Sequence, residues 1–166
     1  VTKAALTATA DNKTKVYGAA NPDLTYTLSG FVNSDDAEDL DEIVVASTVA
    51  DATSNAGTYA ITLNSVTDNN YEVSNVAGEL TVTKAALTAT AENKTKVYGA
   101  TNPELTVAYT GFVNGDDAAD LDEAFVASTV ADATSIAGTY AITLNSIRSE
   151  ERRVGKECKS RRSPNH

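Results

Sequence analysis

Residues 1–10 read VTKAALTATA, and the same ten letters return unchanged at residues 82–91. The offset of 81 residues holds outward from this stretch: of the 66 positions that align residues 1–66 with 82–147, 53 are identical and 13 differ. This period is longer than the roughly 20–50 residues of solenoid repeats and long enough for a small domain. We therefore predict two tandem modules, a complete one at residues 1–81 and a second at residues 82–147.

The correspondence ends abruptly at residue 148. Residues 148–166 contain all five arginines of the chain, Cys158 and His166, and their net charge is +4 against −14 for residues 1–147. The run RSEERRVGKEC resembles the conceptual translation of a sequencing adapter, so we interpret residues 148–166 as a non-native basic tail of a metagenomic fragment. The second module then lacks counterparts of the last strands of the first, which predicts unpaired strand edges.

The composition excludes several classes of protein. The chain has 166 residues, a net charge of −10 and 42% hydrophobic residues, which is a globular rather than a disordered composition. An acidic protein is a poor partner for nucleic acids or anionic membrane surfaces, and no apolar run is long enough to span a bilayer. The chain has no methionine, so we expect it to be a piece of a longer polypeptide.

Alternation of apolar and polar residues dominates each module. Leu24, Tyr26 and Leu28 alternate with threonines, and segments 6–10, 58–63 and 79–83 have the same period of two. The chain has 23 threonines, and β-branched residues favour strands. We predict a mainly β fold with about seven short strands and one short helix per module, in a sandwich-like arrangement. A small β-grasp-like α+β fold is the alternative.

Residues 34–43 are predicted to form the short helix. Ser34 or Asp35 would cap it, and the spacing of Ala37, Leu40 and Ile43 would give one packed face. The segment that joins the modules, residues 80–87, contains no Gly, Pro or Ser. A joint of this kind is not a flexible linker, and it predicts an extended, semi-rigid array.

The sequence offers little for catalysis. Residues 1–147 contain no His and no Cys, which excludes Ser-His-Asp and Cys-His arrangements and His/Cys zinc sites there. No Gly-rich phosphate loop is present, and we predict no enzymatic activity and no cofactor. The acidic runs provide candidate calcium ligands, because hard cations prefer oxygen ligands. These candidates are Asp35, Asp36, Asp39, Asp116, Asp117 and Asp120. A capped and solvated helix face is the more common role of such runs.

One set of motif residues occurs in both copies with the same order and spacing. They are Tyr17, Gly18, Asn21, Pro22, Gly30 and Phe31 in the first copy, and Tyr98, Gly99, Asn102, Pro103, Gly111 and Phe112 in the second. Together with AGTY at residues 56–59 and 137–140, they resemble the MBG domain of YGX type over essentially all of residues 1–147. The resemblance implies a tandem array in a large secreted bacterial surface protein or adhesin.

Two functions follow as hypotheses from this resemblance. The chain is either an extracellular stalk or spacer, whose partners are the neighbouring modules of its own chain, or a module that binds carbohydrate or mucin, or a host or matrix protein. An exposed aromatic cluster in a groove would favour binding, because sugar rings stack on aromatic faces. A uniformly polar and acidic surface would favour the spacer.

Overall fold

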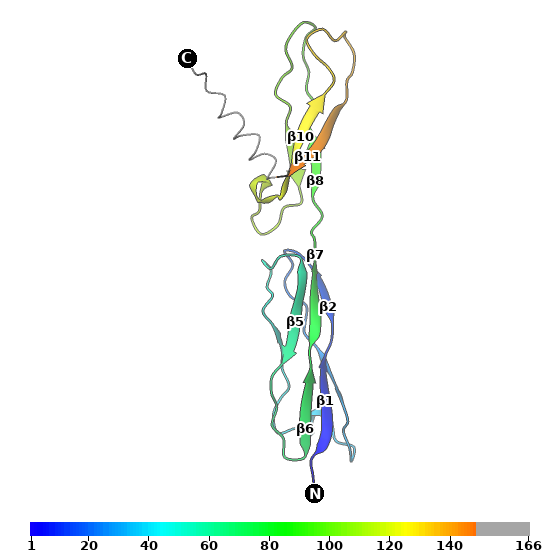
Figure 1. Cartoon of the computed structure of the whole chain (residues 1–166), viewed down its shortest axis with the longest axis vertical. Coiled ribbons are helices and arrows are strands. Elements are labelled where there is room, and N and C mark those ends of the chain that lie inside the picture. The colour runs from blue at the N-terminus through cyan, green and yellow to red at the C-terminus, as the bar shows by residue number, and fades with distance from the viewer. Residues whose placement is uncertain (149–166) are drawn as a thin grey trace, which may run out of the picture. The chain divides into compact units, whose positions relative to one another are not determined.

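The computed structural model describes residues 1–148 (Figure 1). The predicted adapter-derived tail therefore lies outside the described residues, apart from Arg148. The chain divides into two compact units, Val1–Ala85 and the part that begins at Ala86. Each unit is described by itself.

Residues 1–85 form seven strands, which confirms the predicted mainly β fold. The alternating sequence segments account for them, because in each strand the residues of one phase are less exposed than those of the other, most clearly in β1 and β7. The strands are β1 (Ala4–Ala10), β2 (Lys13–Val16), β3 (Tyr26–Ser29), β4 (Ala46–Thr48), β5 (Gly57–Leu63), β6 (Tyr71–Val76) and β7 (Gly78–Thr83).

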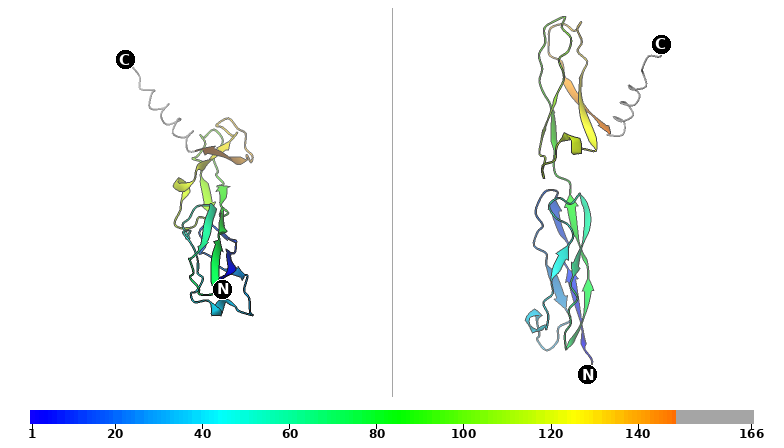
Figure 2. Two further views of the ribbon diagram at one scale, coloured as in Figure 1. Left: turned by 60° about the horizontal axis from the view of Figure 1, so that its bottom comes forward. Right: turned by 90° about the vertical axis from the view of Figure 1, so that its left-hand side faces the viewer.

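These strands form two sheets. Two continuous stretches of chain, β1–β2 and β6–β7, each contribute one strand to each sheet. One sheet has the order β3-β1-β6 and the other has the order β2-β7-β5-β4. β1 runs parallel to β6, and the strands that follow them, β2 and β7, are again parallel to each other. Two of the passages from one sheet to the other, at residues 11–12 and at residue 77, therefore lie side by side (Figures 1 and 2).

The crossing point depends on a close approach of two backbones. A Cβ on Gly78 would lie 2.6 Å from the carbonyl oxygen of Ala10, and backbone atoms cannot move aside as a flexible side chain could. Next to it, the Glu79 amide donates a hydrogen bond of 2.8 Å to the Asn12 side-chain oxygen. Gly78 is therefore required for β6–β7 to cross β1–β2 at this distance.

The core of the first unit follows the predicted alternation. Ile61 and Leu80 are both 0% exposed, and they pack with Ala10 and Ala50 in one cluster. Tyr59 packs against this cluster from the same face of β5 as Ile61, as the period of two predicts. β5 and β7 therefore supply the central side chains of the core.

The predicted helix is much shorter than the sequence indicates. Only Ala37–Asp39 is helical, as a 3₁₀ turn whose N-cap is Asp36 rather than Ser34 or Asp35. The predicted packed face is wrong, because Ala37 and Ile43 are exposed and only Leu40 is half-buried. The backbone is already extended at Leu40, which ends the helical spacing after one turn.

Ser34 has a different role from the predicted cap. It is the second central residue of a turn closed by a hydrogen bond of 3.0 Å from the Asp35 amide to the Val32 carbonyl. Asn33 and Ser34 have φ values of 58° and 68°, so both are left-handed as in a type I′ turn.

The second unit has fewer and differently bounded strands. Within residues 86–148 they are β8 (Thr88–Ala91), β9 (Val107–Thr110), β10 (Glu123–Thr129) and β11 (Ile142–Arg148), with a 3₁₀ turn at Ala118–Asp120. β8 pairs only with β9, and β10 pairs only with β11. Segment 94–97, the counterpart of β2, is not a strand.

Loss of pairing partners explains these differences. In the first unit, β2 pairs with β7 and the start of β1 pairs with β6. The described part of the second unit has no counterpart of β6 or β7, so segment 94–97 and residues 85–87 lack the partners that make them strands. No residue between 86 and 146 is buried, although most of them repeat residues of the first unit. The equivalent of Ile61, Ile142, is only half-buried.

Candidate functional site

The Tyr-Gly motif forms a turn at the end of β2. The Ala19 amide donates to the Val16 carbonyl at 3.0 Å, and Gly18 has a φ of 87°, which favours glycine. The Tyr17 amide donates to the Thr83 carbonyl at 2.8 Å. The motif therefore reverses the chain where β2 leaves β7.

A lysine and an asparagine hold this turn against the loop at residues 50–54. Lys15 is 7% exposed, and its ammonium group donates to the carbonyl oxygens of Ala19, at 3.2 Å, and of Asp51. The side-chain amide of Asn21 donates to the Ala50 carbonyl at 2.6 Å. We call this set, Lys15 and Asn21 with the carbonyls they bind, the clasp.

The second module contains the same clasp. Lys96 donates to the carbonyls of Ala100, at 3.2 Å, and of Asp132, and Asn102 donates to the Ala131 carbonyl at 2.7 Å. Gly99 has a φ of 84°. The clasp therefore forms without strands equivalent to β6 and β7 among the described residues, which makes it a local feature of the motif.

Lys15 and Lys96 are functional motif residues that the sequence reasoning missed. The prediction included Asn21 and Asn102 but treated the lysines as ordinary strand residues. Both lysines stand two residues before the motif tyrosine, but the carbonyl 36 positions away that each one binds cannot be identified from the sequence. Pro22 and Pro103, directly after the asparagines, are half-buried.

The Gly-Phe pair packs a second loop onto β1. A Cβ on Gly30 would lie 2.5 Å from the Ala5 carbonyl oxygen, and Gly30 has a φ of 115°. Gly111 repeats both features, with a φ of 110° and 2.5 Å to the Ala86 oxygen. In the first unit the Phe31 ring meets the buried Tyr71 ring edge-on, with centroids 5.4 Å apart. In the second unit the centroid of the Phe112 ring instead lies 5.7 Å from that of the Tyr109 ring.

The order and geometry of these motifs agree with a family match that covers most of the chain. The MBG domain (YGX type) family matches residues 6–81 and again residues 87–151. The chain belongs to this family. No curated protein and no solved structure matches the chain. Two MBG domains thus stand in tandem, and MBG domains are repeat modules of surface proteins.

The acidic runs of both MBG modules bind backbone amides. Asp36 accepts from the Glu38 amide at 2.8 Å, while the Asp36 amide donates to Asp39 at 2.8 Å, a reciprocal capping box. Asp117 and Asp120 repeat this arrangement.

The remaining calcium candidates, Asp35 and Asp116, stand at the corresponding positions of the two modules. Asp35 accepts from the Tyr71 hydroxyl at 2.7 Å, which raises the pKa of that phenol. No group of three or more acidic, His or Cys residues within 1–148 is placed to hold a metal ion. Calcium binding remains a prediction.

Asp68 organises the turn before β6, and the sequence analysis did not predict this role. Asp68 is 4% exposed, whereas the other acidic residues between 1 and 146 are exposed or half-buried. It accepts from the amides of Asp41, Asn70 and Tyr71 at 3.0, 2.7 and 2.8 Å. The Asp41 amide, followed by those of Asn70 and Tyr71, holds the pKa of Asp68 below its ordinary value.

The tyrosines of the AGTY segments have a structural role. The hydroxyls of Tyr59 and Tyr140 donate to the carbonyls of Asn55 and Ile136, four residues earlier, at 2.9 and 2.8 Å. Tyr17 is half-buried and Tyr98 is 69% exposed.

Within residues 1–148, no helix is long and apolar enough to cross a bilayer.

Proposed function

We propose that the chain is an extracellular structural repeat, a stalk or spacer, of a large bacterial adhesin-like surface protein. On this proposal its partners are neighbouring modules of the same polypeptide, and it has no catalytic activity and no cofactor. The proposal rests on the contacts that the motif residues make within their own module. Lys15, Asn21 and Gly30 are engaged in contacts within the module, so the repeated motif preserves a fold rather than a ligand site.

The aromatic residues of the first module favour the spacer over carbohydrate binding. Tyr17, Tyr26, Phe31 and Tyr59 are half-buried, and Tyr71 is buried. The first module thus has no fully exposed aromatic ring on which a sugar could stack. A large exposed aromatic surface would have supported the binding hypothesis instead.

A glycan array probed with the full chain tests this choice. The spacer proposal expects no glycan to bind above background. Binding of a mucin-type glycan that Tyr17→Ala weakens would replace the spacer by an adhesive module, the alternative function. Tyr26→Ala in the other sheet of the same module is the matched control.

The joint between the modules is short. Only residues 84–87 separate β7 from β8, and they contain no Gly, Pro or Ser. Its composition is therefore not that of a flexible linker, which supports a repeat in a continuous array.

A further inference from the structure

One sheet edge of the first module has an apolar exposed side. β4 is the last strand of the sheet β2-β7-β5-β4, and it pairs only with β5. Exposure alternates along segment 43–50, which contains this strand: Val44 is buried, whereas Ile43, Val45 and Val49 are 79%, 54% and 89% exposed. A strand with one buried face ordinarily directs polar residues to the solvent, so this edge departs from the usual pattern.

The other strands of the same sheet follow the usual pattern more closely. The exposed residues of β5 and β7 include Thr58, Thr62, Thr81 and Thr83. At the opposite edge, β2 contains Lys13, and a charge on an edge strand hinders its pairing with another chain. Segment 43–50 contains no charged residue in a chain of net charge −10. The edge of β4 therefore lacks this protection.

The backbone of β4 presents hydrogen-bonding groups on this edge. The Val45 amide donates to the Asn64 side-chain oxygen at 2.6 Å, and the Val45 carbonyl accepts from the Asn64 amide at 3.1 Å, so Val45 bonds on the side of β5. Because the backbone groups of successive residues in a strand point to opposite sides, those of Ala46 and Thr48 point away from β5. Within residues 1–148 no strand pairs with β4 on that side.

Two copies of this edge are complementary to each other. In an antiparallel pair with Ser47 opposite Ser47 of the second copy, Ala46 and Thr48 face each other and exchange backbone hydrogen bonds. Val45 then stands opposite Val49, since both lie two positions from Ser47. The two-fold symmetry of the pair forms this valine contact twice.

The charges that flank the segment do not oppose this pairing directly. In the same register, the nearest acidic residues, Glu42 and Asp51, stand opposite Ala52 and Ile43 of the second copy. Like charges directly opposite each other would destabilise a strand pair, and none meets here. The segment is short, so a single pair buries little surface and binds weakly.

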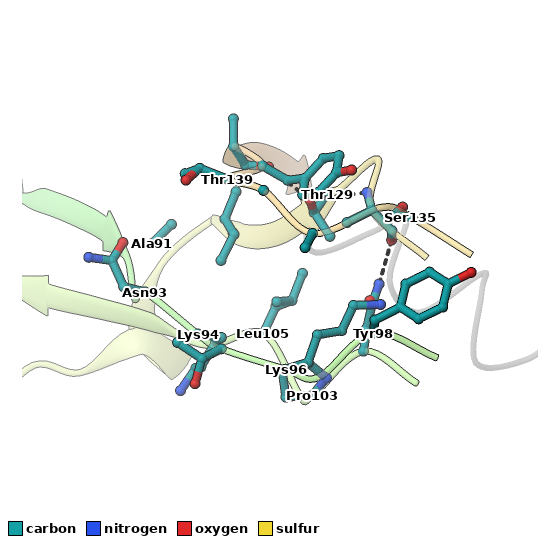
Figure 3. Close-up of a pocket in the computed structure, with 18 of the residues that line it drawn as sticks. Ala91, Asn93, Lys94, Lys96, Tyr98, Pro103, Leu105, Thr129, Ser135 and Thr139 are labelled. Carbon is teal, nitrogen blue, oxygen red and sulfur yellow. Dashed lines mark hydrogen bonds between the residues drawn. The ribbon is translucent and has the colours of Figure 1, made fainter. Parts of the chain in front are cut away.

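The second module repeats this pattern with the same letters. Residues 126–131 read VASTVA, as do residues 45–50. Thr129 and Ala131 line an open groove of the second module (Figure 3), whereas Val130 between them is 87% exposed. Repetition of a weak contact along an array raises the total affinity through effective concentration.

We propose that the edge of β4 is a self-association surface, at which segment 43–49 pairs antiparallel with the same segment of a second copy of this chain. Backbone pairing supplies affinity, and the valine contacts supply the register. This partner is a module of another polypeptide and is additional to the neighbouring modules of the proposed spacer. A chain that stayed monomeric would refute the self-association and leave the spacer function intact.

Sedimentation equilibrium of the full chain, under reducing conditions so that Cys158 forms no disulfide, tests the proposal. The weight-average mass should rise with concentration, and hydrogen exchange of the Ala46 and Thr48 amides should slow as it does. A chain with Val49→Lys and Val130→Lys should dissociate with a constant about tenfold higher or more, because each pair loses its valine contacts.

The matched control makes the same change of charge at the other edge of the sheet. Val16 of β2 is 48% exposed and its counterpart Val97 is 78% exposed. A chain with Val16→Lys and Val97→Lys should associate like the parent. Unchanged hydrogen-exchange protection of β5 and β7 in every variant shows that the first module is folded.

A charge exchange tests the register. A chain with Val45→Lys and Val49→Glu, and the same changes at Val126 and Val130, places opposite charges face to face in the antiparallel pair. It should associate more tightly than the chain with Val49→Lys and Val130→Lys. A parallel pair in register would place like charges together and gain nothing.

Four results would overturn the proposal. They are a chain that stays monomeric up to about 1 mM, an equal loss of association in the Val16→Lys control, and no recovery on charge exchange. The fourth is slower exchange along the free edges of β3 or β6 instead of at Ala46 and Thr48, which would place the contact on the other sheet.

Discussion

Lys15 is a charged residue that forms part of the buried framework. It is 7% exposed, and its ammonium group donates to the backbone carbonyls of Ala19 and Asp51, neither of which lies in a strand. Asn21 donates to a third carbonyl, that of Ala50. The loop at residues 50–54 is thereby fixed to the end of β2, which is a physical reason for the motif to contain these residue types.

Lys15→Met tests this role, because it keeps the length of the side chain and removes the donors. Hydrogen bonds from charged groups contribute roughly 1.5–3 kcal/mol each. We expect the unfolding free energy of the first module to fall by about 2 kcal/mol in urea denaturation. Lys13→Met on the same strand lies outside the clasp and should change it by less than about 0.5 kcal/mol. Equal effects of the two variants would contradict the clasp.

The two copies also contain a natural exchange at a strained turn. Ser34 has a φ of 68°, while its counterpart Gly115 has a φ of 76° in the same turn. Glycine adopts such values without steric cost. Ser34→Gly should therefore stabilise the first module by about 0.5–1 kcal/mol. The reciprocal change Gly115→Ser should destabilise the second module by a similar amount. Thermal melts in which both variants shift in the same direction would contradict the positive φ as the cause.

Asp68 should make the first module sensitive to acid. The pKa of Asp68 is lower in the folded module than in the unfolded chain, where it is near 3.9. Its carboxylate therefore stabilises the fold above the unfolded pKa, and this contribution is lost as the pH falls through the pKa of the folded state. Asp68→Asn should lower stability most at pH 7, and its difference from the parent should shrink below about pH 4. Urea midpoints at pH 7, 5 and 3 measure this, with the exposed Asp23→Asn as control. A constant difference across the series would exclude the carboxylate as the cause.

At the scale of the element, strands were predictable and their pairing was not. The alternation around Tyr59 and Ile61 identifies β5 and its buried face, because one sheet face is buried and the other is solvated. The helix at 34–43 was overestimated, because the residues of its apolar spacing do not pack on one face: Ala37 and Ile43 are exposed, and the backbone is already extended at Leu40.

The residues of the candidate site also divide into those that could be predicted from the sequence and those that could not. The repeated letters identify Gly18, Asn21 and Gly30, whereas Lys15 and Asp68 depend on contacts with residues 36 positions away and 27 positions away, respectively. Such contacts have no local signature in a single sequence, since their partners are backbone carbonyls and amides that every residue carries. Parallel pairing of β1 with β6 and of β2 with β7 is hidden for the same reason.

The crossing of the two long segments gives a prediction for the sheets. Gly78→Ala places a methyl group 2.6 Å from the Ala10 oxygen and 3.0 Å from the Asp11 oxygen, so the backbones must separate. We expect a loss of about 1–3 kcal/mol, the usual cost of overpacking. Ala77→Ser, at the exposed neighbouring position, should be close to neutral. The prediction fails if both variants unfold at the same urea concentration as the parent.

At the scale of the whole chain, nearly identical sequences reach different degrees of burial. The first unit has a core around Leu80 and Ile61, whereas no residue between 86 and 146 is buried. The missing contribution is that of β6 and β7, which bring Tyr71, Leu80 and Val82 into the first core. Each such side chain contributes roughly 1.5–3 kcal/mol on burial. We therefore expect two modules of mostly identical sequence to differ in stability because of one pair of strands.

This difference predicts that the chain unfolds in two transitions, with the second module first. Urea or heat should melt the second unit while the first retains its protection against hydrogen exchange, since their cores are separate and differ in buried apolar area. Amides of β10 and β11 should exchange early, and those of β5 and β7 should exchange last. A single cooperative melt, with equal protection of the two modules, would contradict the unequal cores.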